Sequence, residues 1–291
     1  MRWRGRRGSR NIEDRRGTGG GRRMPGGRRG VKLGGIGGIV VVLLGLFFGV
    51  DLTALVGGGG APGALVQNTS APAAGGQLRD DDEAAQFISV VLRDTEQVWD
   101  KLFDQSGEQY RVPQLVLFTD GVSSACGFAS SAVGPFYCPG DKKVYIDLGF
   151  FRELQRMGAS GDFSQAYVLA HEIGHHVQNL LGVSMSVQRR QREVTKVEAN
   201  RLSVLTELQA DCYAGVWAHH AHQDRQLLEP GDLQEGMNAA ASIGDDALMS
   251  RAGARVRPEK FTHGSSEQRQ QWLLRGLETG DPSSCDTFGR A

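Results

Sequence analysis

One stretch near the middle of the chain, residues 169–178, constrains the fold more than any other. It contains His171, Glu172 and His175 in the order His-Glu-x-x-His. Two histidines four residues apart project from the same face of a helix, so both imidazoles can reach one zinc ion. Glu172 is turned about 100° around the helix axis. It therefore stands beside the ion, where it can take a proton from a metal-bound water.

The residues around this motif indicate burial, and burial favours a bound metal. Buried polar groups cost free energy unless they have partners, and a divalent ion supplies one. The alternative, a helix whose histidines sit at a solvated edge, is disfavoured by the apolar residues that recur at helical spacing, namely Tyr167, Val168, Leu169, Ile173, Val177 and Leu180.

A catalytic zinc site needs a third protein ligand and an open position for water. In one known arrangement a third histidine follows six residues after the second, but this position is Leu181. In the other, the ligand is a glutamate on a later helix, and Glu207 fits. Asp211 lies one turn further on the same face, where it can accept the free N–H of a ligand histidine. Gly215, another turn on, would let two helices approach closely.

With both motifs in place, the chain resembles the gluzincin zinc metallopeptidases, and most closely the neutral zinc metallopeptidases of bacteria. The resemblance implies a zincin-like α+β fold, mainly helical with a small sheet. It also implies one Zn²⁺ per chain and hydrolysis of peptide bonds in a peptide or protein substrate. It covers nearly the whole chain and rests on the basic start Met1-Arg2-Trp3-Arg4-Gly5-Arg6-Arg7, Gly49 to Thr53, Tyr137-Cys138-Pro139, Ala170 to His176, Glu207 to Gly215 and Thr262-His263-Gly264-Ser265.

Two further roles follow from this resemblance. Zincins pair an extended peptide substrate with an edge strand above the metal helix, and residues 144–148 are our candidate for that strand; an ordinary core strand is the alternative. Zincins also place a His or Tyr beside the zinc to stabilise the oxyanion. His263 is our candidate, ahead of Tyr145 and Tyr213, and the alternative is that His263 caps the turn that follows it.

The N-terminal segment, residues 1–32, carries most of the charge asymmetry of the chain. Acidic and basic residues are balanced overall at 33 each, but this segment has eleven Arg and one Lys against two acidic residues, a net charge of +10. It is rich in Gly and poor in apolar residues, which predicts disorder. An Arg/Gly arm could bind nucleic acid, but the segment that follows it favours a role in membrane topology, and we expect no nucleic-acid partner.

Residues 33–50 contain no charge, and a transmembrane anchor is predicted over residues 33–56. The basic residues before it place the N-terminus in the cytoplasm and the rest of the chain outside the cell membrane, in the periplasm or at the exterior of a bacterium. A cleavable signal peptide is the alternative. The basic region is long for one, and the best small-residue sites lie well past the apolar run, so we favour an uncleaved, single-pass anchor.

The remaining chain divides into a Gly/Ala/Pro-rich linker over residues 57–78 and one metallopeptidase domain over residues 79–291. Residues 183–196 are strongly charged and are expected to form a mobile surface segment near the site. Four cysteines allow three pairings, and an oxidising location permits disulfides. We favour Cys126–Cys138 and Cys212–Cys285.

The sequence therefore predicts a membrane-anchored zinc endopeptidase. We expect His171, His175 and Glu207 to bind the metal, Glu172 to act as the general base, and Asp211 to orient a ligand. The alternative is a catalytically silent zincin domain that binds peptides or proteins of the cell envelope. The intact Glu172 argues against it, because a silent site needs no base.

Overall fold

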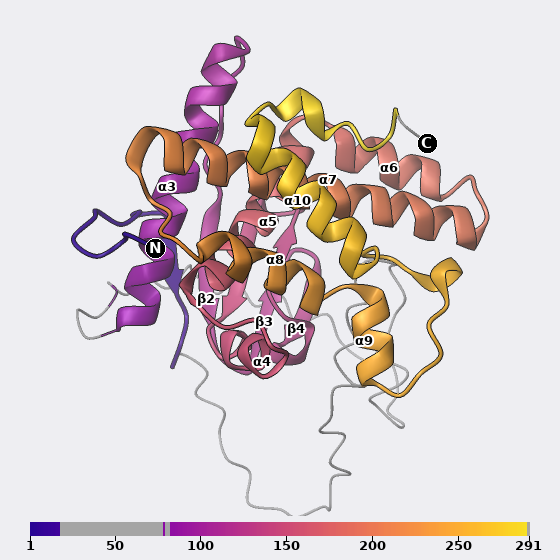
Figure 1. Ribbon diagram of the computed structural model, residues 1–291. Helices are drawn as coiled ribbons and strands as arrows, with labels where there is room; N and C mark the ends of the chain where they lie inside the picture. Colours follow the sequence, from indigo (N-terminus) through magenta and orange to yellow (C-terminus); the bar gives the residue numbers. More distant parts are fainter. Residues whose placement is uncertain (18–77, 79–81, 290–291) are drawn as a thin grey trace, which may run out of the picture.

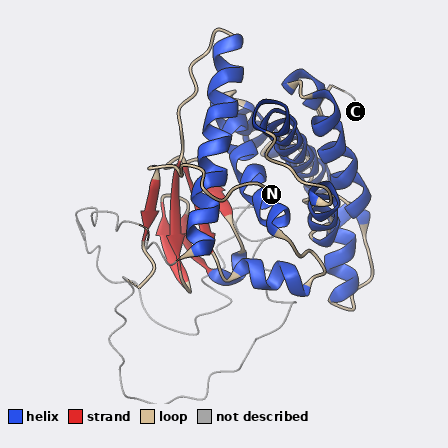
Figure 2. Cartoon of the chain, turned by 60° about the vertical axis from the view of Figure 1, so that its left-hand side comes forward, coloured by secondary structure: helices blue, strands red, loops and turns tan. Residues whose placement is uncertain are grey.

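The structure, a computed structural model, describes residues 1–17, 78 and 82–289. A small sheet lies on one side of the molecule and most of the helices lie on the other, with the long helix α3 (Glu83–Gln105) between them in the view of Figure 2. The predicted architecture, mainly helical with a small sheet, is confirmed for these residues. The further helices are α4 (Phe150–Arg156), α5 (Asp162–Leu180), α6 (Val183–Gln191), α7 (Lys196–Arg225), α8 (Asp232–Ser242), α9 (Asp245–Arg251) and α10 (Ser266–Thr279).

The main sheet has the strand order β1-β2-β6-β5. Strands β1 (Ile12–Asp14), β2 (Gln114–Phe118) and β6 (Lys143–Asp147) are parallel, and β5 (Phe136–Cys138) runs antiparallel to β6. A separate hairpin is formed by β3 (Gly121–Ser124) and β4 (Gly127–Ser130).

The prediction that residues 144–148 form an edge strand is wrong. Strand β6 has a hydrogen-bonded neighbour on each side, β2 and β5. Its residues Val144, Tyr145 and Ile146 are at most 1% exposed, as is typical of a strand covered on both faces. Strand β5 is the outer strand of the described sheet on this side, and the core-strand alternative describes β6.

The two motif helices, α5 and α7, lie in the core, and α10 packs across α7 (Figure 1). Glycines make this crossing possible. A Cβ added at Gly215 of α7 would clash with the carbonyl oxygen of Leu273, and one at Gly276 of α10 would clash with the carbonyl oxygen of Cys212. The close helix approach expected at Gly215 is thus confirmed, and it joins the second motif to the C-terminal part of the chain.

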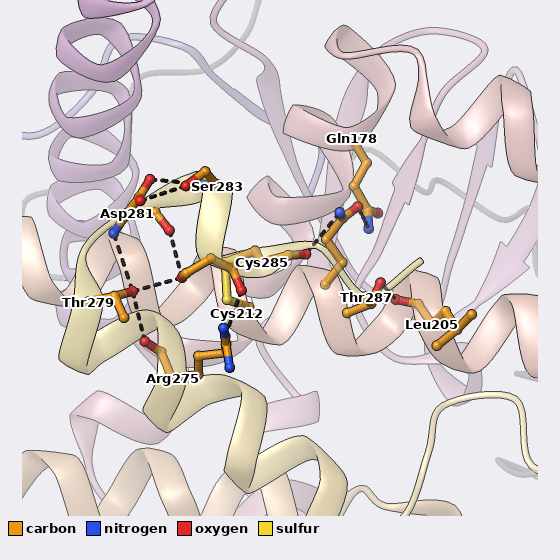
Figure 3. Close-up of a disulfide and its surroundings, with 11 residues drawn as sticks. Gln178, Leu205, Cys212, Arg275, Thr279, Asp281, Ser283, Cys285 and Thr287 are labelled. Atoms are coloured by element: carbon orange, nitrogen blue, oxygen red, sulfur yellow. Dashed lines mark hydrogen bonds between the residues drawn. A yellow bond between two sulfur atoms is a disulfide. The ribbon is translucent and has the colours of Figure 1, made fainter. Parts of the chain in front are cut away.

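Both predicted disulfides are present: Cys126–Cys138 and Cys212–Cys285. The first ties the β3–β4 turn to the end of β5. The second ties α7 to a short 3₁₀ helix at Pro282–Cys285 (Figure 3).

Two expectations about flexible segments need correction. Residues 1–17 do not behave as a disordered arm, because Met1 and Trp3 are only 7% exposed and β1 pairs with β2. The folded unit therefore includes residues 1–17 in addition to the expected domain. Residues 183–196 are largely helical, as α6 and the start of α7.

The predicted anchor over residues 33–56 and most of the predicted linker lie outside the described residues. Among the residues that the structure describes, none of the helices combines the length and apolar character that crossing a bilayer requires.

Candidate metal centre and catalytic cleft

The structure brings the three predicted metal ligands together. The Nε2 atom of His171 lies 3.1 Å from Oε2 of Glu207, and Nε2 of His175 lies 3.4 Å from Oε1 of the same carboxylate. Helix α5 presents both imidazoles one turn apart, and α7 presents the glutamate opposite them. All three side chains are buried, and one ligand atom from each falls within 4.8 Å of the others. Two imidazole nitrogens and a carboxylate oxygen are a donor set that suits Zn²⁺.

Asp211 holds the first of these histidines as predicted. The Nδ1 atom of His171 lies 2.8 Å from Oδ1 of Asp211, so the imidazole donates Nδ1–H to the carboxylate and turns Nε2 toward Glu207. Asp211 is fully buried and also accepts hydrogen bonds from the Tyr167 hydroxyl and from Arg269. These partners satisfy a charge that would otherwise be costly to bury.

Arg269 and Tyr167 are site residues that sequence reasoning missed. Arg269 is 2% exposed and binds the Asp211 carboxylate with two nitrogens, Nε at 2.8 Å and Nη2 at 2.9 Å. In the sequence it stands in a polar stretch of α10 that is typical of an exposed helix. Tyr167 fits the apolar stripe of α5, so its hydroxyl group gave no signal of a role at the site.

A second hydrogen-bond chain supports the other histidine. Nδ1 of His175 donates to Oε1 of Gln178 at 2.9 Å, and Gln178 donates from Nε2 to Oε1 of Gln209 at 3.0 Å. Gln209 in turn donates to the carbonyl oxygen of Cys285 at 3.1 Å. Figure 3 shows Gln178 near the segment that follows Cys285 of the Cys212–Cys285 disulfide. The disulfide is therefore linked to the metal site through glutamine side chains. Only Gln178, three residues after His175, stands at a spacing that could have suggested this.

The charges of the site favour a cation. Burial would raise the pKa of Glu207, but the two imidazoles outweigh it and hold this pKa well below its usual range. Burial would likewise lower the pKa of His171, but Asp211 and Glu207 raise it to about 10. A bound cation would therefore have to displace a proton from the His171 imidazole. For Glu172, burial dominates and raises the pKa, which suits a group that must accept a proton near neutral pH.

A cavity of about 430 Å³ lies over the three ligands. Glu172 and His263 line it together with the ligands, as do Phe136 and Tyr137 of β5 and residues of the β3–β4 hairpin and of α6. Much of its wall is apolar. The cavity thus combines a cation site, a carboxylate with a raised pKa and the outer strand of the sheet.

His263 lies in this cavity, whereas the weaker candidates do not line it. Nδ1 of His263 is 3.1 Å from Oδ1 of Asp245, and the His263 main-chain N–H donates to Oδ2 at 2.7 Å. Burial would lower the pKa of His263, but the hydrogen bond with Asp245 and the charge of Glu207 raise it. Tyr145 donates to Asp141, and Tyr213 packs edge-on against Trp99.

Asp245 is another residue that sequence reasoning missed. It begins α9, and one of its oxygens accepts main-chain N–H groups of the turn at residues 262–264. Asp245 therefore caps this turn, and the His263 side chain does not.

Three further histidines, His176, His219 and His220, have structural partners. His176 contacts the Tyr137 hydroxyl at 3.0 Å and the Arg111 carbonyl oxygen at 2.6 Å, and burial lowers its pKa to about 4. His219 and His220 contact the carbonyl oxygens of Leu277 and Gly280, at the end of α10. They stabilise a helix end.

A second carboxylate group, Asp162, Asp232 and Glu235, lies outside the cleft at the starts of α5 and α8. The amino nitrogen of Met1 is 3.0 Å from Asp162 and 3.3 Å from Asp232. Glu235 accepts the main-chain N–H of Phe163 at 3.0 Å. The group therefore has a cationic and a main-chain partner, and we assign no metal to it.

Comparison with known proteins agrees with this geometry. The chain is 48% identical over 294 residues to "Uncharacterized protein YpfJ" of Escherichia coli, a match that covers all of both chains. It is 44% identical over 226 residues to "Uncharacterized protein Mb2605" of Mycobacterium bovis, covering 74% of this chain and 75% of that protein. No solved structure matches. Residues 1–288 match the family described as "Putative neutral zinc metallopeptidase", and the chain belongs to this family.

Proposed function

We propose that this chain is a zinc-dependent endopeptidase in which His171, His175 and Glu207 bind one Zn²⁺. The observation that supports this most directly is the convergence of two Nε2 atoms on the Glu207 carboxylate, in a cavity that Glu172 also lines. Family membership supports the same chemistry. When bound, the zinc would polarise a water molecule and the carbonyl group of the scissile peptide bond.

Each of the neighbouring residues has a distinct task in this proposal. The Glu172 carboxylate accepts the proton that the attacking water loses and later delivers it to the leaving amine. His263 donates a hydrogen bond to the oxygen of the former carbonyl group, where negative charge develops. Asp211 and Gln178 hold the two ligand histidines in the tautomer that keeps Nε2 available.

Strand β5 is the candidate for substrate binding in place of residues 144–148. It is the outer strand of the described sheet, and its residues Phe136 and Tyr137 line the cavity. An extended peptide could add to this edge by main-chain hydrogen bonds, which would lay its peptide bonds across the cavity.

The proposal extends to membrane attachment through residues 33–56 and a catalytic domain outside the cytoplasm. The uncharged stretch at residues 33–50 supports membrane attachment. The two disulfides support a location outside the cytoplasm, because disulfides persist in oxidising compartments.

The test measures zinc content and peptide hydrolysis on the same purified full-length samples. We expect about one zinc per wild-type chain and cleavage of a mixture of quenched fluorescent peptides. Glu172→Gln should keep zinc and the melting temperature while losing about 10²–10⁴-fold in rate. Glu207→Ala should lose zinc as well. Glu193→Gln, at an exposed glutamate, is the matched control.

Two results would count against the proposal. Hydrolysis retained in Glu172→Gln would exclude the carboxylate as the base. Zinc bound by a wild-type chain that cleaves none of the peptides would favour the silent binding domain instead.

A further inference from the structure

The segment that precedes the predicted membrane anchor is built into the catalytic domain. Residues 1–17 run alongside α3, where Figure 1 shows them in indigo, and they end in β1 at the edge of the sheet. Their apolar, polar and main-chain contacts reach α3, α7 and β2.

The apolar contacts belong to the main core of the domain. Trp3 is 7% exposed and packs edge-on against Phe87 of α3, with ring centroids 5.2 Å apart. Both residues belong to the same apolar cluster as Ile173 of the motif helix. Removing the segment would expose part of this apolar cluster to water, which is unfavourable.

The polar contacts are specific to this pairing of segments. Ser9 and Ser89 of α3 exchange two hydrogen bonds, from Ser9 N to Ser89 O at 2.9 Å and from Ser89 Oγ to Ser9 O at 3.2 Å. Oε1 of Glu96, a side chain only 2% exposed, accepts from Ser9 Oγ at 2.6 Å and from Asn11 Nδ2 at 2.7 Å. A Cβ at Gly8 would clash with the Ser89 side chain.

Main-chain pairing continues into the sheet. Leu115 donates its N–H to the carbonyl oxygen of Asn11 at 2.9 Å, and β1 pairs with β2 in parallel register from Ile12 onward. Lys143 of β6 contacts the Glu13 carboxylate at 3.0 Å. The segment is therefore a strand of the sheet in addition to a cover for α3.

The two segments that flank residues 18–77 contact each other. Nη1 of Arg16 lies 2.5 Å from Oδ2 of Asp82, the residue that caps the start of α3. Leu78 packs against the same core. The chain thus leaves the domain and returns to it beside one ion pair.

We infer that residues 1–17 lie on the same side of the membrane as the catalytic cleft. A single spanning helix separates its two ends by about 30 Å of hydrocarbon, and no segment can dock on a domain across that distance. This docking does not depend on zinc chemistry. It excludes the expected arrangement of a cytoplasmic N-terminus with an external domain, and it requires that the chain between residues 17 and 78 begin and end on one face of the membrane.

The first test compares accessibility from one side of the membrane. Arg10→Cys reports on the segment and Gln105→Cys on the domain, both at exposed positions of the full-length chain. The four native cysteines are paired in disulfides, so they contribute little background. A membrane-impermeant maleimide should label both reporters in intact cells, or both only after permeabilisation. Labelling of one reporter in intact cells and of the other only after permeabilisation would overturn the inference.

The second test asks whether the segment is docked in the membrane-bound protein. Ser9→Cys combined with Ser89→Cys should form a disulfide, seen as retention of the N-terminal fragment after cleavage at a protease site placed in residues 57–77. The matched control combines Ser9→Cys with Gln105→Cys, at the other end of α3. Cross-linking of the first pair no stronger than that of the control would show that the segment is not docked.

Discussion

Replacing Arg269 by methionine should destabilise the metal-free protein more than any exposed arginine replacement. Arg269 is 2% exposed and forms two hydrogen bonds to the Asp211 carboxylate, at 2.8 and 2.9 Å. A third goes to the Tyr167 hydroxyl at 3.2 Å. Methionine keeps much of the apolar stem but leaves Asp211, which is 0% exposed, without its cationic partner. Burial then favours the protonated carboxyl group, which binds His171 less well.

The size of the stability loss follows from the buried Asp211 charge that remains without its partner. Removing one partner of a buried ion pair costs about 3–5 kcal/mol, because the other charge stays buried. For a domain of about 150–250 residues, 1 kcal/mol corresponds to about 2–4 °C in melting temperature. We therefore expect Arg269→Met to lower the melting temperature by about 6–20 °C.

The assay is thermal unfolding followed by circular dichroism in the presence of a chelator, with Arg255→Met at an exposed position as the control. The double variant Asp211→Leu with Arg269→Met removes both charges and should recover a large part of the loss. A single variant no less stable than the Arg255→Met control would refute the reasoning. So would a double variant that loses the sum of the two single effects, because the penalty would then not come from an unpaired charge.

Three further predictions concern the surroundings of the metal centre. Asp245→Asn should shift the alkaline limb of kcat/KM to lower pH. The reason is that Asp245 raises the pKa of His263, so the wild-type imidazole stays protonated, and able to donate, to higher pH. An unshifted limb would exclude His263 as the titrating donor. Cys212→Ser with Cys285→Ser should cost about 2–5 kcal/mol in urea unfolding and weaken zinc binding in a competition titration; unchanged zinc affinity would show that the disulfide does not brace the site. Gly215→Ala should lower the free energy of unfolding by about 1–3 kcal/mol by overpacking the α7–α10 crossing. Urea unfolding would measure this loss, with the slope m unchanged. Wild-type stability would mean that the two helices can separate without cost.

Helical periodicity explains why the candidate metal ligands could be predicted to lie together. Residues at i and i+4 share a face in any helix, so the sequence alone places His171 with His175, and Glu207 with Asp211. The two disulfides were also predicted correctly. The edge strand was not, because the short run at Phe136–Cys138 gave no sign that it would pair beside residues 143–147 and become the edge strand itself.

Long-range polar contacts explain most of what could not be predicted. Arg269 reaches Asp211 over a separation of 58 residues, and Gln209 reaches the carbonyl oxygen of Cys285 over 76. Neither pairing follows a period. The prediction of disorder for residues 1–17 was wrong for a similar reason. It rested on their composition, which does not show the surface on which they dock. A few apolar side chains, including Trp3, suffice when the domain provides a matching surface.

The rigidity of the metal centre depends on a part of the chain that supplies no ligand. His171 is fixed through Asp211 by Arg269 of α10, and His175 is fixed through two glutamines by the carbonyl oxygen of Cys285. The proposed ligands come from α5 and α7, yet both supporting hydrogen-bond chains end in residues 266–285. Ligand imidazoles whose second nitrogen is held bind metal more tightly and in one orientation. We therefore expect the C-terminal part of the chain to influence how tightly the proposed site binds metal, although it carries neither motif.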